Sequence, residues 1–230
     1  TRLLDSWSKN NCGGETVPLW KRTACVRYFQ NLPSKGKTLK TIIIGNGVAG
    51  ISVAETIRNA DPEHELSIFT DEAEPYYSRP RLIEVLSGKA TQTQIAIHPF
   101  AWYEQKRIDL RHASRIDSID PVARRIADDR GAIHGYDRLV IATGAACNEP
   151  PIPGAGLEKV FTLRTAADAA AIRTAAAGTV SAVVIGGGLQ GIEIGCSLRT
   201  LGLDTTIIEV RDRLLPQQLD AEGSAMVRTL

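Results

Sequence analysis

The sequence has almost no net charge, no paired cysteines and no long apolar run, and each absence excludes a class of protein. Its 230 residues carry a formal net charge of +1, so no overall field draws the chain to nucleic acid or to a membrane surface. The four cysteines form no CxxC or CxxxxC pair, which argues against a zinc ribbon and a local redox dithiol and fits a reducing, cytoplasmic setting. No run of about 18 apolar residues occurs, so we predict no membrane span.

Motifs for metal binding and serine hydrolysis are missing as well. The four histidines are scattered along the chain and show neither HExxH nor HxH spacing. No GxSxG elbow occurs. We therefore predict no metal site and no serine-hydrolase chemistry.

The two ends of the chain are unusual. The first residue is Thr1 and the only methionine is Met226, so we expect a fragment or a processed chain. Residues 1–38 show no regular period, and the first 40 residues hold an excess of six positive charges. We interpret residues 1–38 as an irregular, solvated basic arm, because no aromatic ladder or known motif supports nucleic-acid binding.

The remaining residues contain two strand–helix–strand patterns. The first predicts strands over 41–44 and 66–70 around a helix over 48–60, because short β-branched runs flank a helical period. The second predicts strands over 180–185 and 205–209 around a helix over 189–201.

Other elements are expected between and after these units. Short strands over 115–119, 125–129 and 132–136 indicate an antiparallel meander, and an apolar strand follows over 138–142. Short helices are predicted near 99–106, over 166–177 and from Asp220 onward. The sequence thus predicts an α/β fold of two Rossmann-like, three-layer units with an antiparallel β-meander, truncated inside the second unit. The Pro/Gly-rich stretch over 148–156 separates a domain over 39–150 from an incomplete domain over 151–230.

Each unit carries a GxGxxG turn between its first strand and its helix. In the first turn, Gly45 makes the tight turn, Gly47 lets the backbone approach a pyrophosphate, and Gly50 lets helix and strand pack closely. The same roles fall to Gly186, Gly188 and Gly191 in the second turn. The helix N-terminal amides provide the positive end for the phosphates, so both turns are predicted to bind a dinucleotide.

The acid at the end of the second strand differs between the units. Glu209 stands where a ribose-binding carboxylate is needed, and it favours NADH over NADPH because it would repel a 2′-phosphate. Arg211 lies close enough to weaken that preference. In the first unit Thr70 takes the matching position and Asp71 follows it, so the carboxylate comes late.

The residue two positions after the last glycine of each turn also differs. Glu193 follows the second turn, where the first has Ser52. A buried Glu in that helix would be costly unless it faced a site, so Glu193 is a candidate site residue. The alternative is a Glu in the first helical turn that interacts with the helix dipole.

Two such units joined by an ATG-ended strand (RLVIATG, residues 138–144) resemble the FAD- and NAD(P)-dependent pyridine nucleotide-disulphide oxidoreductase superfamily. Within it, YYSRPRLIEVLSGK and RLLPQQLDAEG resemble the branch of NADH:rubredoxin reductases and of the flavoprotein part of NAD(P)H-nitrite reductases. The related oxygenase ferredoxin reductases usually have a Lys near Glu84, so this residue points away from them.

The resemblance implies FAD at the first turn and NADH at the second. It implies that Arg79 and Pro80 lie against the flavin ring, unless they only form a helix-entry turn. It also implies cofactor contacts through the following residues: Ile116 at the adenine, Ala142, Thr143 and Gly144 beside the FAD, and Glu193 at the nicotinamide.

The sequence departs from the disulphide reductases of this superfamily. No cysteine occurs between Cys25 and Cys147, so a flavin–disulphide relay is not expected. We interpret Cys147 and Cys196 as packing residues. We do not expect this stretch of sequence to contain the later flavin contact or the C-terminal interface domain of the superfamily.

Three functions remain open from the sequence. The first is a reductase that passes hydride from NADH to FAD and electrons to rubredoxin or another small iron protein. The second is the flavin module of a nitrite reductase, with an attached redox domain as acceptor. The third is an NADH- and FAD-binding sensor or interaction module without turnover.

Overall fold

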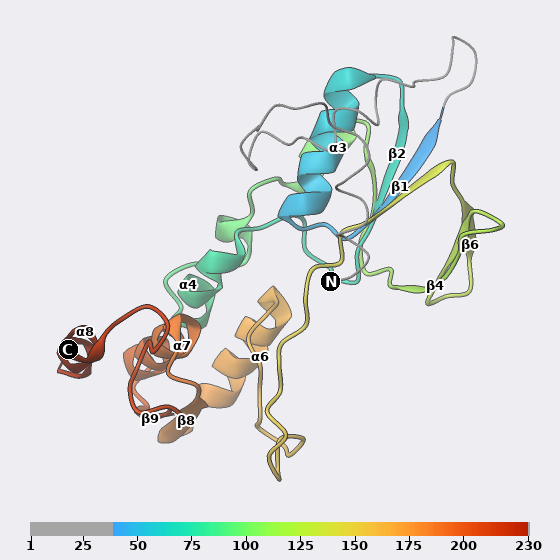
Figure 1. Cartoon of the computed structure of the whole chain (residues 1–230). Helices are drawn as coiled ribbons and strands as arrows, with labels where there is room; N and C mark the ends of the chain where they lie inside the picture. The colour runs from blue at the N-terminus through green and yellow to red at the C-terminus, as the bar shows by residue number, and fades with distance from the viewer. Residues whose placement is uncertain (1–38, 230) are drawn as a thin grey trace, which may run out of the picture. The chain divides into compact units, whose positions relative to one another are not determined.

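The computed structural model describes residues 39–229, and its first strand follows directly after Leu39 (Figure 1). Its first sheet is parallel and has the order β3-β2-β1-β7. The strands are β1 (Lys40–Ile44), β2 (Glu65–Phe69), β3 (Asp109–Arg111) and β7 (Arg138–Ile141). Residues 41–44 of β1 are all buried, as expected for a central parallel strand whose two faces are both covered. Helix α3 (Val48–Ala60) crosses from β1 to β2 and packs against the sheet through Ile51, Ala54 and Ile57.

The C-terminal end of α3 is held by a buried arginine. The Arg58 side chain is only 8% exposed. Its guanidinium donates to five backbone carbonyls, those of Asp61, Pro62, His64, Lys106 and Arg107, at 2.6 to 3.3 Å. The bonds to Lys106 and Arg107 join the end of α3 to the residues that lead into β3.

A second, antiparallel sheet is formed by β4 (Ile116–Asp120), β5 (Arg125–Asp128) and β6 (Ile133–Gly135). Ile126 of β5 is buried and packs with Ile42, Ile44 and Phe69 of the first sheet. The meander therefore lies against the face of the parallel sheet near the carboxyl ends of its strands (Figure 1).

The third sheet belongs to the second strand–helix–strand unit. It pairs β8 (Ser181–Ile185) with β9 (Asp204–Ile208) in parallel, and α7 (Leu189–Thr200) connects them. Val184, Leu198 and Leu203 form its buried cluster. The other face is open in the described part of the chain, where Val183 and Ile208 are 61% and 53% exposed.

Short helices fill the connections. They are η2 (Arg79–Arg81), α4 (Leu82–Leu86), η3 (Thr93–Ile95), α5 (Phe100–Gln105), α6 (Ala166–Ala176) and α8 (Ala221–Arg228). Helix α4 packs against α6 and α7, and its Leu82 and Leu86 share a buried cluster with Tyr77, Leu163 and Ala166. A capping box between Thr165 and Asp168 starts α6, and the side chain of Asp220 caps α8.

The predicted α/β fold class is confirmed, with its two parallel sheets and its antiparallel meander. The predicted strands and helices occur within one or two residues of the expected bounds. Strand β3 and helix α4 were not predicted. The predicted basic arm over 1–38, with Cys12 and Cys25, lies outside the described residues.

Candidate cofactor-binding sites

The first glycine turn has the geometry that a pyrophosphate needs. Gly45 has a φ of 113°, which favours glycine, and its N–H donates to Phe69 O at 2.7 Å. A Cβ on Gly50 would lie 2.0 Å from Gly45 O, so only glycine fits where α3 crosses the turn. Gly47 is the N-cap of α3, has no side-chain cap, and would have open space around a Cβ. The first amides of α3 therefore face space without a protein side chain to satisfy them.

A cavity of about 650 Å³ opens at this turn. It lies at the carboxyl ends of β1, β2 and β7, the edge where open α/β sheets bind ligands. The cavity is lined by nearly all the residues predicted for the first site: Gly45, Gly47, Thr70, Asp71, Arg79, Pro80, Ile116, Ala142, Thr143 and Gly144. Gly50 is the exception, because it is buried beneath the turn.

The acids near the end of β2 have different roles. Thr70 is buried, and its hydroxyl accepts from Glu72 N, so it forms a turn rather than presenting a charge. Glu72 is hydrogen bonded to Tyr77 and forms an ion pair with Arg79. Asp71 is exposed and lines the cavity, which leaves its carboxylate available to a ligand.

The Arg79 side chain is fixed from several directions. Besides its ion pair with Glu72, it donates to Arg164 O at 2.7 Å and to the Tyr77 hydroxyl at 3.2 Å. Burial, and then the hydrogen bond to Glu72, raise the pKa of Tyr77, so the phenol remains protonated at neutral pH. The same hydroxyl accepts from Ala166 N, which ties this part of the cavity wall to the start of α6.

Arg164 lines the cavity and was not predicted from the sequence. A Cβ on Gly144 would lie 3.0 Å from its Nη2 atom, so the guanidinium sits beside the ATG turn. Among residues 39–229, no carboxylate forms an ion pair with it. Arg164 therefore brings a positive charge, without an ion-pair partner among the described residues, to a cavity predicted to hold a diphosphate. Only its position after the apolar run that ends at Leu163 could have drawn attention to it.

The second turn repeats the first. Gly186 has a φ of 114°, its N–H donates to Ile208 O at 2.7 Å, and a Cβ on Gly191 would lie 1.9 Å from Gly186 O. Gly188 is the N-cap of α7, again with no side-chain cap and with open space around a Cβ.

Glu209 lies beside this turn, as its place at the end of β9 predicts. Its Oε2 accepts from Gly187 N at 2.7 Å and its Oε1 accepts from Arg211 N at 2.9 Å. These N–H groups, Arg211 first and then Gly187, lower the pKa of the Glu209 carboxyl, so it is ionised at neutral pH. The turn therefore has a fixed negative charge beside it.

Glu193 is not the buried residue that one argument from the sequence assumed. It is exposed on α7, so the cost of burying a charge does not arise. It also lies beyond the first turn of α7, which contains no acidic residue, so the helix-dipole alternative does not hold either. Its role at the nicotinamide stays a prediction from the resemblance alone.

The interpretation of both cysteines as packing residues is wrong for one of them. Cys147 is half-buried, with its sulfur 3.8 Å from Leu163 O, whereas Cys196 is exposed on α7. An exposed thiol on a helix contributes little to packing.

The two turns differ in what stands next to them. In the first, β7 follows β1 in the sheet, and a Cβ on Gly45 would lie 2.2 Å from Ala142 O. In the second, a Cβ on Gly186 would meet no atom within 4 Å in the described part of the chain. Strand β7 thus closes one side of the first turn, and the matching side of the second turn is open in the described part of the chain.

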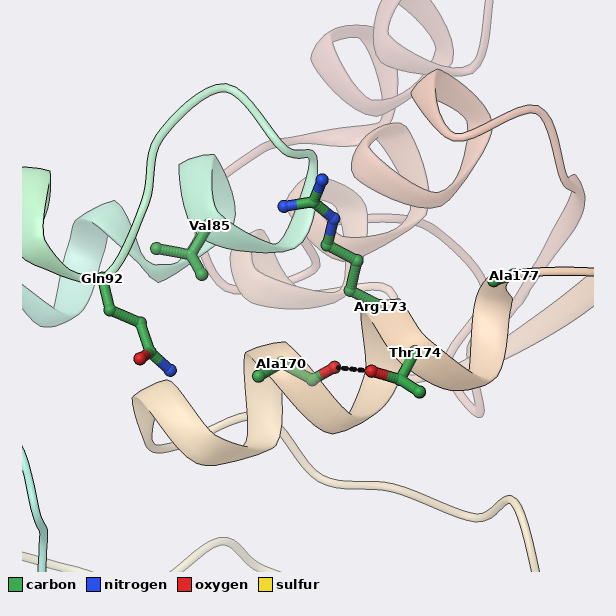
Figure 2. Close-up of a pocket in the computed structure, with 6 residues that line it drawn as sticks. All are labelled: Val85, Gln92, Ala170, Arg173, Thr174 and Ala177. Carbon is green, nitrogen blue, oxygen red and sulfur yellow. Dashed lines mark hydrogen bonds between the residues drawn. The ribbon is translucent and has the colours of Figure 1, made fainter.

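A second cavity, of about 540 Å³, lies between α4 and α6 (Figure 2). Arg173 reaches from α6 toward the loop after α4, and Gln92 approaches from the other side, where its amide donates to Ala166 O. The Thr174 hydroxyl donates to Ala170 O within α6 and is not available to a ligand. None of the six residues that line this cavity is a glycine.

The family model for pyridine nucleotide-disulphide oxidoreductases matches residues 39–230. The chain belongs to this family. The resemblance drawn from the two glycine turns is confirmed. The description of the family names oxidoreductases that act with a pyridine nucleotide.

Relatives in the family include several kinds of reductase. The chain is 33% identical to a nitrite reductase [NAD(P)H] of Bacillus subtilis over 81% of its own length and 23% of the relative's. It is 36% identical to the ferredoxin–NAD(+) reductase component of a biphenyl dioxygenase system of Paraburkholderia xenovorans, over 81% of this chain and 46% of the relative. The solved structure of NADH:rubredoxin oxidoreductase from Clostridium acetobutylicum matches with a TM-score of 0.75 and 28% identity, over 84% of this chain and 50% of that one. The chain thus spans half or less of the length of these relatives.

Within residues 39–229, no three His, Cys, Asp or Glu side chains gather as a metal site would require. None of the helices described there is long and apolar enough to cross a membrane.

Proposed function

We propose that the chain is the cofactor-binding part of a flavoprotein reductase that takes a hydride from NADH and delivers electrons to a small iron protein such as rubredoxin. The observation that carries this proposal is the pair of uncapped glycine turns, one facing a large cavity and one beside an ionised glutamate. In this proposal residues 39–150 bind FAD and residues 151–230 bind NADH.

The residues of the first cavity fit FAD. The space at Gly47 admits a pyrophosphate to the free amides of α3, and Arg164 adds a positive charge. Asp71 would accept hydrogen bonds from the ribose, and backbone near Ile116 would meet the adenine. Arg79 and Pro80 would lie against the flavin ring, and Thr143 and Gly144 would border it. When bound, FAD accepts a hydride and passes electrons on one at a time.

The residues of the second turn fit NADH better than NADPH. The amides of α7 would bind the pyrophosphate, and Glu209 would accept hydrogen bonds from the adenosine ribose. A 2′-phosphate would stand close to the ionised Glu209 carboxylate and be repelled. Glu193 would line the nicotinamide pocket.

The test has two steps. Purified chain is first titrated with FAD, NADH and NADPH, and we expect saturable binding of FAD and tighter binding of NADH than of NADPH. FAD-loaded protein is then mixed with NADH without oxygen, and the visible flavin absorbance is expected to bleach and to return when oxidised rubredoxin is added. A chain that binds neither dinucleotide would contradict the proposal. The substitution Glu209→Gln should reduce the preference for NADH, whereas Glu158→Gln, in the crossover loop that connects β7 to α6, should leave it unchanged.

A second candidate is supported by the nitrite reductase relative, which this chain matches at 33% identity. In that case the acceptor is an attached redox domain and not a separate protein. The two are told apart by the gene sequence after the codon for Leu230 and by the acceptor assay. An in-frame cysteine-rich extension, together with no reoxidation by rubredoxin, would favour the second candidate.

A further inference from the structure

A buried tyrosine outside both predicted sites contacts the middle residue of the first glycine turn. Tyr103 lies on α5 and is only 2% exposed. Its hydroxyl lies 2.9 Å from Asn46 Oδ1, and Asn46 stands between Gly45 and Gly47. The same hydroxyl accepts from Tyr76 N at 3.0 Å.

The two bonds fix the orientation of the Asn46 amide. Because the Tyr76 N–H already donates to the phenol oxygen, the single phenol proton is free to be donated to Asn46 Oδ1. The oxygen of the amide therefore faces Tyr103, and its nitrogen faces away. That nitrogen donates to no other described residue, although Asn46 lines the cavity.

The bonds also join two walls of the cavity. Asn46 belongs to the glycine turn, and Tyr76 belongs to the loop that leads to Arg79. The second turn is held differently. There the middle residue is Gly187, whose N–H donates to Glu209 and whose carbonyl accepts from Leu215 N at 2.9 Å.

We propose that Tyr103 is a positioning residue for the cofactor of the first site, and that it holds Asn46 so that the amide NH2 donates to the phosphate or ribose of the dinucleotide. This inference rests on the proposed function, because it requires FAD at the first turn. Tyr103 itself does not touch the cofactor. Asn46 does.

The experiment is a double-mutant cycle on the 230-residue chain, with Tyr103→Phe, Asn46→Ala and both together. FAD and NADH dissociation constants are measured by fluorescence titration, and thermal unfolding is followed in parallel. Each single variant should weaken FAD binding about five- to tenfold, as expected for the loss of one positioned hydrogen bond. The double variant should bind FAD no more weakly than the single variant with the lower affinity, because Tyr103 acts on the cofactor only through Asn46. NADH binding should not change, since the second turn has its own contacts.

Tyr136→Phe is the matched control. Tyr136 is half-buried against the same sheet, and its hydroxyl makes no hydrogen bond to a described residue, so FAD binding should stay at the wild-type level. Additive losses in the cycle, or equal weakening of NADH, would show that Tyr103 acts only through general stability and would overturn the inference. So would wild-type FAD affinity in Tyr103→Phe. A wild-type chain that binds no FAD would instead contradict the proposed function, and the inference with it.

Discussion

Placing a methyl group on the second glycine of each turn separates binding from folding. Gly47 and Gly188 have φ, ψ of −91°, −172° and −77°, −179°, which any residue can adopt. A Cβ at either position would have no atom within 4 Å. Gly47→Ala and Gly188→Ala should therefore fold normally, with a free energy of unfolding that is unchanged or about 0.4–1 kcal/mol higher, because alanine restricts the unfolded chain.

The same methyl group would stand where the pyrophosphate approaches the turn. Displacing a phosphate from one or two backbone amides removes charge-assisted hydrogen bonds of about 1.5–3 kcal/mol each. A loss of about 3 kcal/mol corresponds to about a hundredfold increase in the dissociation constant. Gly47→Ala should thus lose FAD and keep NADH, whereas Gly188→Ala should lose NADH and keep FAD.

The assay combines urea unfolding with fluorescence titrations of FAD and NADH. Gly156→Ala is the control, because a Cβ there also meets nothing within 4 Å but lies in the crossover away from both turns. Gly50→Ala gives the contrast, since its Cβ would lie 2.0 Å from Gly45 O and the fold itself should weaken. Wild-type FAD affinity in Gly47→Ala would refute the placement of the pyrophosphate at this turn.

Three other predictions concern stability and association. Arg58→Met should lower the free energy of unfolding by about 3 kcal/mol or more, measured in urea, because five carbonyls lose a buried donor; a loss below about 1 kcal/mol would contradict this. Hydrogen bonds, from His134 first, lower the pKa of Asp128, so its contribution to stability is present above the ordinary carboxyl pKa of about 4 and is lost as pH falls through the lowered value. Asp128→Asn should therefore flatten the fall of the urea midpoint below about pH 4, and an unchanged acid profile would refute this assignment. The open face of β8 and β9 should bind a hydrophobic dye, and Val183→Lys with Ile208→Lys should reduce that binding; undiminished dye fluorescence would place the exposed apolar surface elsewhere.

The sequence predicted the two units well because each has a local signal. An apolar β-branched strand, three glycines and a helical period lie within about 30 residues, and strand and helix bounds follow from them. The lining of the first cavity was also predictable, because the carboxyl ends of parallel strands meet at one edge.

Elements held by distant contacts could not be predicted in the same way. Strand β3 is only three residues long, DLR, and two of them are charged; its pairing with β2 makes it a strand. Helix α4 has five residues and is stabilised by packing against α6 and α7, more than 70 residues away in sequence. The position of Arg164 beside Gly144 likewise depends on the path of the crossover between them.

The place of β7 in the first sheet has a consequence for how the protein folds. β7 pairs with β1, and Lys40 N donates to Asp137 Oδ2 across 97 residues of chain. During synthesis, β1 and β2 therefore emerge long before the strand that completes the turn at Gly45 is available. Contacts of such long range make folding slow, and until they form the apolar edge of β1 is exposed to other chains. We expect refolding yield to fall as protein concentration rises, and a ligand of the first turn to form its site only after this late pairing.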